Sequence, residues 1–139
     1  FLIMSEEKLQ SEIVRKFSEL FPDKRGQLFH VPNQRAHKLQ AFIARAIGIF
    51  PGVSDLIYFE DDLKLGLEIK APDSRHKVQH VEQQLEWGEI LESKKGIWRI
   101  IRSVDDAISF IEGDYTKGLT ISDVREMIRL NGGKKTIKF

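Results

Sequence analysis

Residues 52–70, GVSDLIYFEDDLKLGLEIK, place charged side chains inside an apolar stretch. Asp55 lies near the start of this stretch, and Glu68 and Lys70 lie near its end. Carboxylate oxygens are the ligands that Mg²⁺ and Mn²⁺ prefer in proteins, and these ions also bind water and phosphate oxygens. A lysine beside the metal can help to deprotonate an attacking water and can stabilise charge on the phosphate. The residue types therefore indicate metal-assisted chemistry on a phosphate group.

The apolar residues of the same stretch predict a β-hairpin, with strands at 54–59 and 64–70 and a turn at 60–63. In that register, paired residues have numbers that sum to 123, so Asp55 lies opposite Glu68. The Cβ atoms of directly opposed residues are about 5 Å apart, and two carboxylates at that distance repel each other. A cation between the two carboxylates would remove the repulsion.

Side chains alternate between the two faces of a strand, so Glu68 and Lys70 are expected on one face. The other face carries three apolar residues, Leu65, Leu67 and Ile69, which can pack in a core. A plainer alternative is that the aspartate caps a turn, while the glutamate and the lysine form an ion pair that protects a sheet edge. The combined pattern, an aspartate followed after twelve residues by Glu-X-Lys on a hairpin, favours the metal site.

Helical and strand patterns alternate along the rest of the chain. Apolar residues at helical spacing predict helices at 5–21, 36–48, 73–93, 103–113 and 120–131. Short apolar runs predict strands at 27–31 and 97–101, and the basic tail at 133–139 is a candidate last strand. This order favours an α/β fold with a mixed central sheet. At 139 residues the chain is expected to form one domain, in which residues 114–139 are a C-terminal extension.

The sequence also indicates which residues cap the predicted helices and which helix faces are apolar. The candidate N-caps are Ser5, Asp73 or Ser74, Ser103, and Thr120 or Ser122. The first helix is expected to bury a stripe of four residues: Leu9, Ile13, Phe17 and Leu20. The last helix has an apolar face that could pack either on a partner or on the chain's own core: Ile121, Val124, Met127 and Ile128.

Composition excludes several other classes of site. The sequence contains no cysteine, so disulfides, thiolate metal sites and cysteine nucleophiles are excluded. No apolar run approaches the roughly 20 residues that span a bilayer, so a membrane role is not expected. The lack of cysteine and of a visible leader fits a cytoplasmic protein. Met4 is expected to be the natural first residue, with residues 1–3 preceding it.

The net charge of +1 gives no overall preference for nucleic acid, but the basic residues are clustered. One cluster contains Lys70, Arg75, His76, Lys77 and His80. Two others contain Arg35, His37, Lys38 and Arg45, and Lys134, Lys135 and Lys138. Such clusters are either solvated surface or contacts for phosphate groups.

An aspartate before one strand and Glu-X-Lys at the end of the next resemble the motif of the PD-(D/E)XK nuclease superfamily. The surrounding segments narrow the resemblance: FHVPN at 29–33, GVSDL at 52–56, QLEW at 84–87, and Gly96 before an apolar strand. From residue 5 to about 112 the chain resembles the VRR-NUC family, in the stand-alone form typical of phages and bacteria. The resemblance implies a restriction-endonuclease-like core of αβββαβ type with an extra C-terminal helix. The family's usual proline before the aspartate is Ser54 here, a change that removes no metal ligand.

The resemblance also implies roles for particular residues. Asp55 and Glu68 match the metal ligands, with the backbone carbonyl of Ile69 as a third, and the implied cofactor is Mg²⁺ or Mn²⁺. Lys70 matches the catalytic lysine. Gln84 matches the glutamine on the helix after the motif, and an ordinary buried amide is the alternative for this residue.

The first helix of this superfamily often contributes a glutamate to the catalytic site. Glu6 fits this role best, because Glu6-X-X-Leu9-Gln10 is similar to the family spacing and because Glu6 shares a helical stripe with Leu9. Glu7 and Glu12 are competitors for the same role.

The resemblance implies that the substrate is DNA and that the activity is that of a metal-dependent endonuclease. The residues expected to contact the DNA backbone are Asn33, Arg35, Lys38, Arg75 and Lys77. For Asn33 and Arg35 a role as turn residues is an equal alternative. No element that reads bases is visible, so structure-selective cleavage is expected. Similarity to stand-alone family members implies a homodimer that acts on four-way (Holliday) junctions. The alternatives are a module of the same fold that binds DNA without cleaving it, or one selective for flap, nicked or single-stranded DNA.

Overall fold

The structure is a computed structural model, and it describes residues 5–32, 48 and 50–139. The helix expected at 36–48 lies outside the described residues except for Gly48. Three expected DNA contacts, Asn33, Arg35 and Lys38, also lie outside them.

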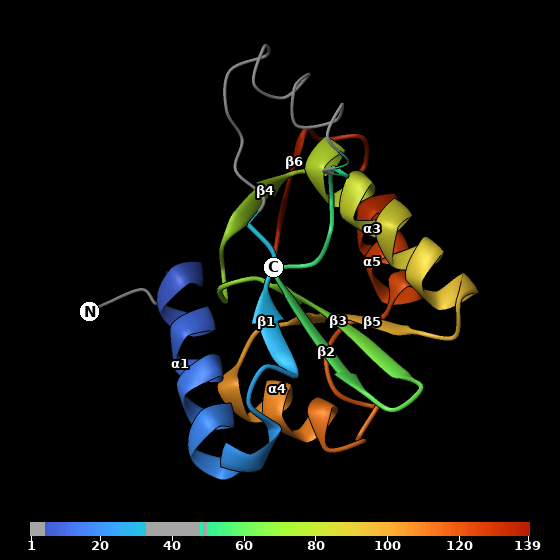
Figure 1. Ribbon diagram of the computed structural model, residues 1–139. Coiled ribbons are helices and arrows are strands. Elements are labelled where there is room, and N and C mark those ends of the chain that lie inside the picture. Colours follow the sequence, from blue (N-terminus) through green and yellow to red (C-terminus); the bar gives the residue numbers. More distant parts are fainter. Residues whose placement is uncertain (1–4, 33–47, 49) are drawn as a thin grey trace.

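A four-stranded mixed sheet forms the centre of the fold, in the order β1-β2-β3-β5 (Figure 1). The strands are β1 (Leu28–His30), β2 (Leu56–Glu60), β3 (Leu63–Ile69) and β5 (Ile97–Ile101). β2 pairs antiparallel with both β1 and β3, whereas β3 and β5 run parallel. A parallel pair needs a crossover connection, and α3 (Val78–Ser93) supplies it. The expected α/β architecture with a mixed sheet is confirmed.

Helices cover both faces of this sheet (Figure 1). α1 (Glu6–Leu20) and α4 (Val104–Ile111) pack on one face, and α3 and α5 (Ile121–Leu130) pack on the other. A short 3-10 helix, η1 (Pro22–Lys24), follows α1. In the described parts of the chain, no helix is both long and apolar enough to cross a membrane.

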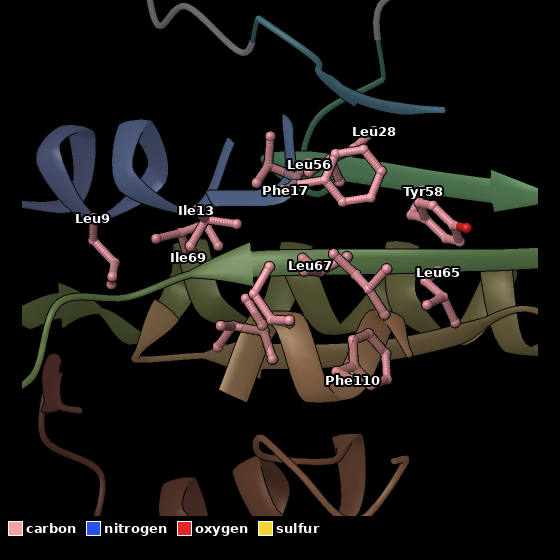
Figure 2. Close-up of a cluster of buried hydrophobic side chains, with 14 residues drawn as sticks. Leu9, Ile13, Phe17, Leu28, Leu56, Tyr58, Leu65, Leu67, Ile69 and Phe110 are labelled. Carbon is pink, nitrogen blue, oxygen red and sulfur yellow. The ribbon is translucent and has the colours of Figure 1, made fainter. Parts of the chain in front are cut away.

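The stripe expected on the first helix is confirmed at three of its four positions. Leu9, Ile13 and Phe17 of α1 are buried against the sheet (Figure 2). Leu20 is 46% exposed, so its expected burial is wrong. Phe21 continues the four-residue spacing instead, and its ring centroid lies 5.3 Å from that of Phe17.

The alternation expected in β3 is confirmed. Leu65, Leu67 and Ile69 belong to the core between the sheet and the α1–α4 layer (Figure 2). The intervening residues face α3, because a Cβ atom added at Gly66 would lie 3.1 Å from the ring of Trp87 on that helix. The glutamate two residues after this glycine points to the same side of the strand.

A second core fills the space between the sheet and the α3–α5 layer. Trp98 of β5 is fully buried there, and a Cβ atom added at Gly88 of α3 would lie 2.8 Å from its side chain. Val124 of α5 is also fully buried. The other residues of its apolar face pack against the same core: Ile121, Met127 and Ile128. This face is therefore used within the chain, and it gives no support to a partner surface.

The β2–β3 hairpin has the predicted register, with Leu56 opposite Leu67 and all partner numbers summing to 123. The turn is tighter than the four residues expected, because Glu60 still pairs with Leu63. Asp61 in this turn has a φ of +51°, a left-handed conformation that aspartate adopts more readily than most residues.

The helix expected to begin at Asp73 or Ser74 begins later. A separate two-stranded sheet pairs β4 (Arg75–Lys77) with β6 (Thr136–Lys138), and α3 starts only after β4. The predicted start of this helix is therefore wrong, because the partner strand lies near the other end of the chain and no local pattern shows the pairing. The Ser74 hydroxyl does not cap α3 and donates instead to the carbonyl of Ala71 at 2.6 Å.

The other N-caps agree with the sequence. The side chains of Ser5 and Ser103 accept hydrogen bonds from backbone N–H groups in the first turns of α1 and α4. Thr120, rather than Ser122, caps α5, where it forms a reciprocal capping box with Asp123. These bonds satisfy N–H groups that have no partner within the helix.

Candidate active site

The carboxyl groups of Asp55 and Glu68 meet at one end of the β2–β3 hairpin. Asp55 lies immediately before β2, and its Oδ2 accepts a hydrogen bond of 2.8 Å from the backbone N–H of Ile69. Glu68 is only 2% exposed, and its carboxyl group is close enough to that of Asp55 for the charge of the aspartate to raise its pKa. The hairpin register therefore brings the two carboxyl groups together.

The loop that carries Asp55 rests on α3. Gly52 has a φ of +85°, and a Cβ atom added there would lie 2.4 Å from the backbone oxygen of Gln83, an approach that only glycine allows. Beside this contact, Nε2 of Gln84 donates to Oε1 of Glu68 at 3.0 Å. The glutamine thus faces the sheet, as the helical stripe predicts, and it orients the glutamate.

The environment of Glu68 disfavours its charged form. Burial raises the pKa of the Glu68 carboxyl well above its ordinary value, and the negative charge of Asp55 raises it further. The positive charge of Lys70 acts in the opposite direction. Oε2 of Glu68 is buried and receives no hydrogen bond from an N–H or O–H group in the described part of the chain. The pair of carboxyl groups is therefore poorly stabilised when both are ionised.

Lys70 and Glu6 lie beside this pair. Lys70 is 3% exposed, and the carboxyl group of Glu6, in the first turn of α1, is close enough to Lys70 and to the backbone of Ala71 for both to lower its pKa. Burial raises the pKa of the Glu6 carboxyl, but its close contact with His76 and the positive charge of Lys70 outweigh burial and lower the pKa below its ordinary value. Of the three candidate glutamates of the first helix, Glu6 is the one that contacts site residues within the part of the chain that the structure describes.

His76 also lies in the site, although the sequence distinguishes it only as a member of a basic cluster. Its Nε2 lies 2.7 Å from Oε1 of Glu6, and its Nδ1 lies 3.5 Å from Nζ of Lys70. Its position depends on the pairing of β4 with β6, so neither helical spacing nor strand alternation near residue 76 could predict it.

Arg75 and Lys77, two of the expected DNA contacts, are exposed on β4. They flank His76, and strand alternation points them to the opposite side of β4. Lys138 lies opposite Arg75 in the β4–β6 pair, is exposed, and forms an ion pair of 3.5 Å with Asp73. The outer face of this strand pair therefore presents cations to solvent close to the site.

A search of solved structures found a protein named "VRR_NUC domain protein", with a TM-score of 0.64 and 19% sequence identity. The match covers 86% of this chain and 94% of the other chain. The chain has the fold of a VRR_NUC domain protein. Neither a scan against protein-family models nor a search of the curated proteins gave a match. The neighbour therefore establishes the VRR_NUC fold, and the chemistry has to be argued from the site itself.

The residues at this end of the VRR_NUC fold fit a hard divalent cation. Asp55 and Glu68 offer carboxylate oxygens, and Oε1 of Gln84 is a further buried acceptor without a partner among the described residues. The described residues contain no group of three or more His, Cys, Asp or Glu placed to hold a metal ion. Mg²⁺ is commonly held by one or two carboxylates, with water and phosphate oxygens as its other ligands. The carbonyl of Ile69 stays a predicted third ligand.

Replacing Glu68 with glutamine should stabilise the protein when divalent cations are absent. Because the folded-state pKa of Glu68 lies above the ordinary value of 4.5, the folded protein binds this proton more tightly than the unfolded chain. Wild-type stability therefore falls as the pH rises from the ordinary value through the folded-state pKa, and Glu68→Gln lacks this loss. We expect Glu68→Gln to gain about 1–3 kcal/mol near neutral pH, the usual penalty of a buried unsatisfied polar group.

Urea unfolding in a chelator, at about pH 5 and about pH 8, measures this difference. Glu112→Gln, at an exposed position, is the matched control and should change the free energy of unfolding by less than about 0.5 kcal/mol. A Glu68→Gln variant no more stable than wild type at the higher pH would show that neither burial nor the charge of Asp55 disfavours the ionised carboxyl group of Glu68.

Proposed function

We propose that this protein is a metal-dependent endonuclease that hydrolyses phosphodiester bonds in DNA. The observation that carries the proposal is the buried carboxyl pair of Asp55 and Glu68 with the buried ammonium of Lys70 beside it. Strongly shifted pKa values caused by burial and by a like charge are typical of functional sites. The VRR_NUC fold supports the proposal, because these are the residues that resemble the nuclease motif.

Each residue of the site has a distinct part in this reaction. Asp55 and Glu68 would hold Mg²⁺ or Mn²⁺, and the bound ion would polarise the scissile phosphate and lower the pKa of a water molecule. Gln84 fixes the orientation of Glu68 through its hydrogen bond of 3.0 Å. Lys70 would orient the attacking water and stabilise the charge that develops on the phosphate. Glu6 adds a carboxylate that can accept a hydrogen bond near Lys70.

The DNA would be held through its phosphate groups and not read through its bases. Exposed basic side chains lie on β4 and near the end of the chain: Arg75, Lys77, Lys134, Lys135 and Lys138. Three more predicted contacts lie outside the described residues: Asn33, Arg35 and Lys38. Contacts between cations and phosphates give affinity without sequence information. We therefore propose cleavage that is selective for DNA structure.

Cleavage should require both the carboxyl pair and Lys70. Asp55→Asn, Glu68→Gln and Lys70→Ala are each expected to lower the cleavage rate by at least about 100-fold, because each removes a group that acts on the reacting phosphate or its metal. The measurement uses labelled junction, flap, nicked, single-stranded and linear DNA with Mg²⁺ or Mn²⁺. Glu112→Gln is the control that should cleave like wild type.

The same panel can contradict the proposal in two separate ways. A wild-type protein that cleaves none of the substrates with either metal would exclude the nuclease, and DNA binding alone would then favour a non-catalytic module. Wild-type rates in the three site variants would show that the chemistry lies elsewhere in the molecule.

Binding of the metal should be detectable without DNA. Mg²⁺ or Mn²⁺ should raise the unfolding temperature of the wild type, since a ligand at 100 times its Kd stabilises a folded protein by about 2.7 kcal/mol. A chelator should reverse the shift, and Asp55→Asn and Glu68→Gln should show little of it. An equal shift in Glu68→Gln and in wild type would place the metal outside this carboxyl pair.

We further propose that the enzyme acts as a homodimer on four-way DNA junctions. Support for this step comes from the resemblance to stand-alone family members, since two sites related by a two-fold axis could cut opposing strands. The apolar face of α5 packs on the chain's own core, so the dimer interface would lie elsewhere. Light scattering should give the mass of a dimer. A monomer mass at the concentration that cleaves junctions would exclude paired cleavage.

A further inference from the structure

We propose that His76 and Phe139 are positioning residues that direct the ammonium group of Lys70 in the active site. The proposal rests on the proposed nuclease function and adds two residues that the Asp and Glu-X-Lys motif does not contain. Three features support it: the strand pair that places both residues, the hydrogen bonds that orient the imidazole, and the aromatic ring near the ammonium.

The β4–β6 pair (Figure 1) brings His76 close to Phe139, the residue after β6, and the centroids of the two rings lie 5.7 Å apart. His76 lies opposite Ile137, which is 3% exposed and belongs to the second core, so this face of the strand pair is anchored inside the molecule. Phe139 follows β6, and its backbone N–H donates to the carbonyl of Ser74 at 2.9 Å. Arg102 donates to the carbonyl of Phe139 at 2.8 Å. The position of both rings is thus fixed by backbone contacts.

The neighbours of the His76 ring determine which nitrogen carries the hydrogen. Nε2 lies 2.7 Å from Oε1 of Glu6 and 2.9 Å from Oγ of Ser74. The Ser74 hydroxyl donates its own hydrogen to the carbonyl of Ala71, so its oxygen accepts from Nε2, and Nε2 carries a hydrogen. Oε1 of Glu6 lies within ion-pair distance of the same nitrogen but receives no well-directed hydrogen bond from the described residues. In the neutral ring Nδ1 is then an acceptor, and it faces Nζ of Lys70 at 3.5 Å. His76 therefore links Glu6 to Lys70 in one chain of contacts.

Phe139 gives the ammonium a second neighbour. Its side chain is buried, and Nζ of Lys70 lies 5.9 Å from the centroid of its ring. A cation near the face of an aromatic ring is attracted by the ring quadrupole. The same ring packs edge-on against His76, with centroids 5.7 Å apart. The two rings therefore limit the directions that the long lysine side chain can take.

Lys70 is held without a direct ion pair. Among the described residues, no carboxylate forms a salt bridge with its ammonium group, and Glu6 and Glu68 attract it from longer range. An ammonium group has three N–H donors, of which His76 takes one. The other two donors have no hydrogen-bond partner among the described residues, so a phosphate oxygen or a water molecule could accept from them. The contacts with His76 and Phe139 therefore orient the ammonium group of Lys70 and still leave it N–H groups that can donate hydrogen bonds to a substrate.

Loss of either ring should slow chemistry more than it weakens DNA binding. His76→Ala and Phe139→Leu are expected to lower the single-turnover cleavage rate by about 10- to 100-fold, because small displacements of a catalytic group have effects of this size. The Kd for the same DNA, from fluorescence anisotropy in a chelator, should change by less than about threefold. His76→Asn keeps an acceptor near the position of Nδ1 and should recover much of the rate.

Ile137→Val is the matched control, because it loosens the packing of the same strand pair without touching Lys70. It should cleave at the wild-type rate. An equal rate loss in Ile137→Val and Phe139→Leu, or wild-type cleavage by His76→Ala, would overturn the positioning role. So would a rate loss fully explained by weaker DNA binding. Urea unfolding confirms that each variant is folded under the assay conditions.

A measurement without DNA separates this proposal from the nuclease function. The rings of Phe139 and His76 should shift the NMR signals of the Lys70 ε-methylene protons away from those of exposed lysines, and Lys70→Arg assigns these signals. Phe139→Leu should remove most of this shift, whereas Ile137→Val should keep it. If the wild type cleaves no DNA, the nuclease proposal fails while this test still applies. Lys70 signals unchanged in both Phe139→Leu and His76→Ala would refute the positioning role.

Discussion

The contact between the carboxyl groups of Asp55 and Glu68 is unfavourable by itself, because Glu68 is buried and both groups can carry negative charge. It persists because the backbone holds both residues in place. Oδ2 of Asp55 accepts from the N–H of Ile69, and Oε1 of Glu68 accepts from Gln84. The remainder of the fold compensates for this local loss through the packing of two cores. Such a site is rigid because the elements that carry it are fixed by contacts unrelated to its chemistry.

The position of β3 explains how one strand can serve both a core and a site. β3 lies inside the sheet, between β2 and β5, so helices can cover both of its faces. Its apolar side chains pack toward α1 and α4. On the other face, Gly66 leaves room for Trp87 of α3, and Glu68 follows where the loop at Gly52 meets the same helix. Close packing against α3 therefore continues up to the carboxyl pair, which restricts the access of water to Glu68.

The parts of the site that could be predicted from the sequence depend on local order. Strand alternation and a short turn are sufficient to set the hairpin register. The sequence alone therefore predicts that Asp55 lies opposite Glu68. Helical spacing is sufficient to predict that Gln84 faces the sheet. The resemblance to a known motif is sufficient to select Glu6, rather than the other glutamates of the first helix, as the one in the site. What failed was contact between distant segments: the sequence near His76 is compatible with a helix start, and only the far strand β6 makes it a strand.

The strand pair β4–β6 also has a consequence for the order in which the molecule folds. The register that opposes Asp55 and Glu68 needs only a hairpin, whose strands are joined by a short turn, whereas the surroundings of Lys70 need segments from the first helix, the middle and the end of the described chain. Closing a longer loop adds only about 0.6 kcal/mol for each doubling of its length, but contacts distant in sequence slow the search for the native state. We expect the hairpin register to form early in folding, and the environment of the lysine to form only once the last strand has docked.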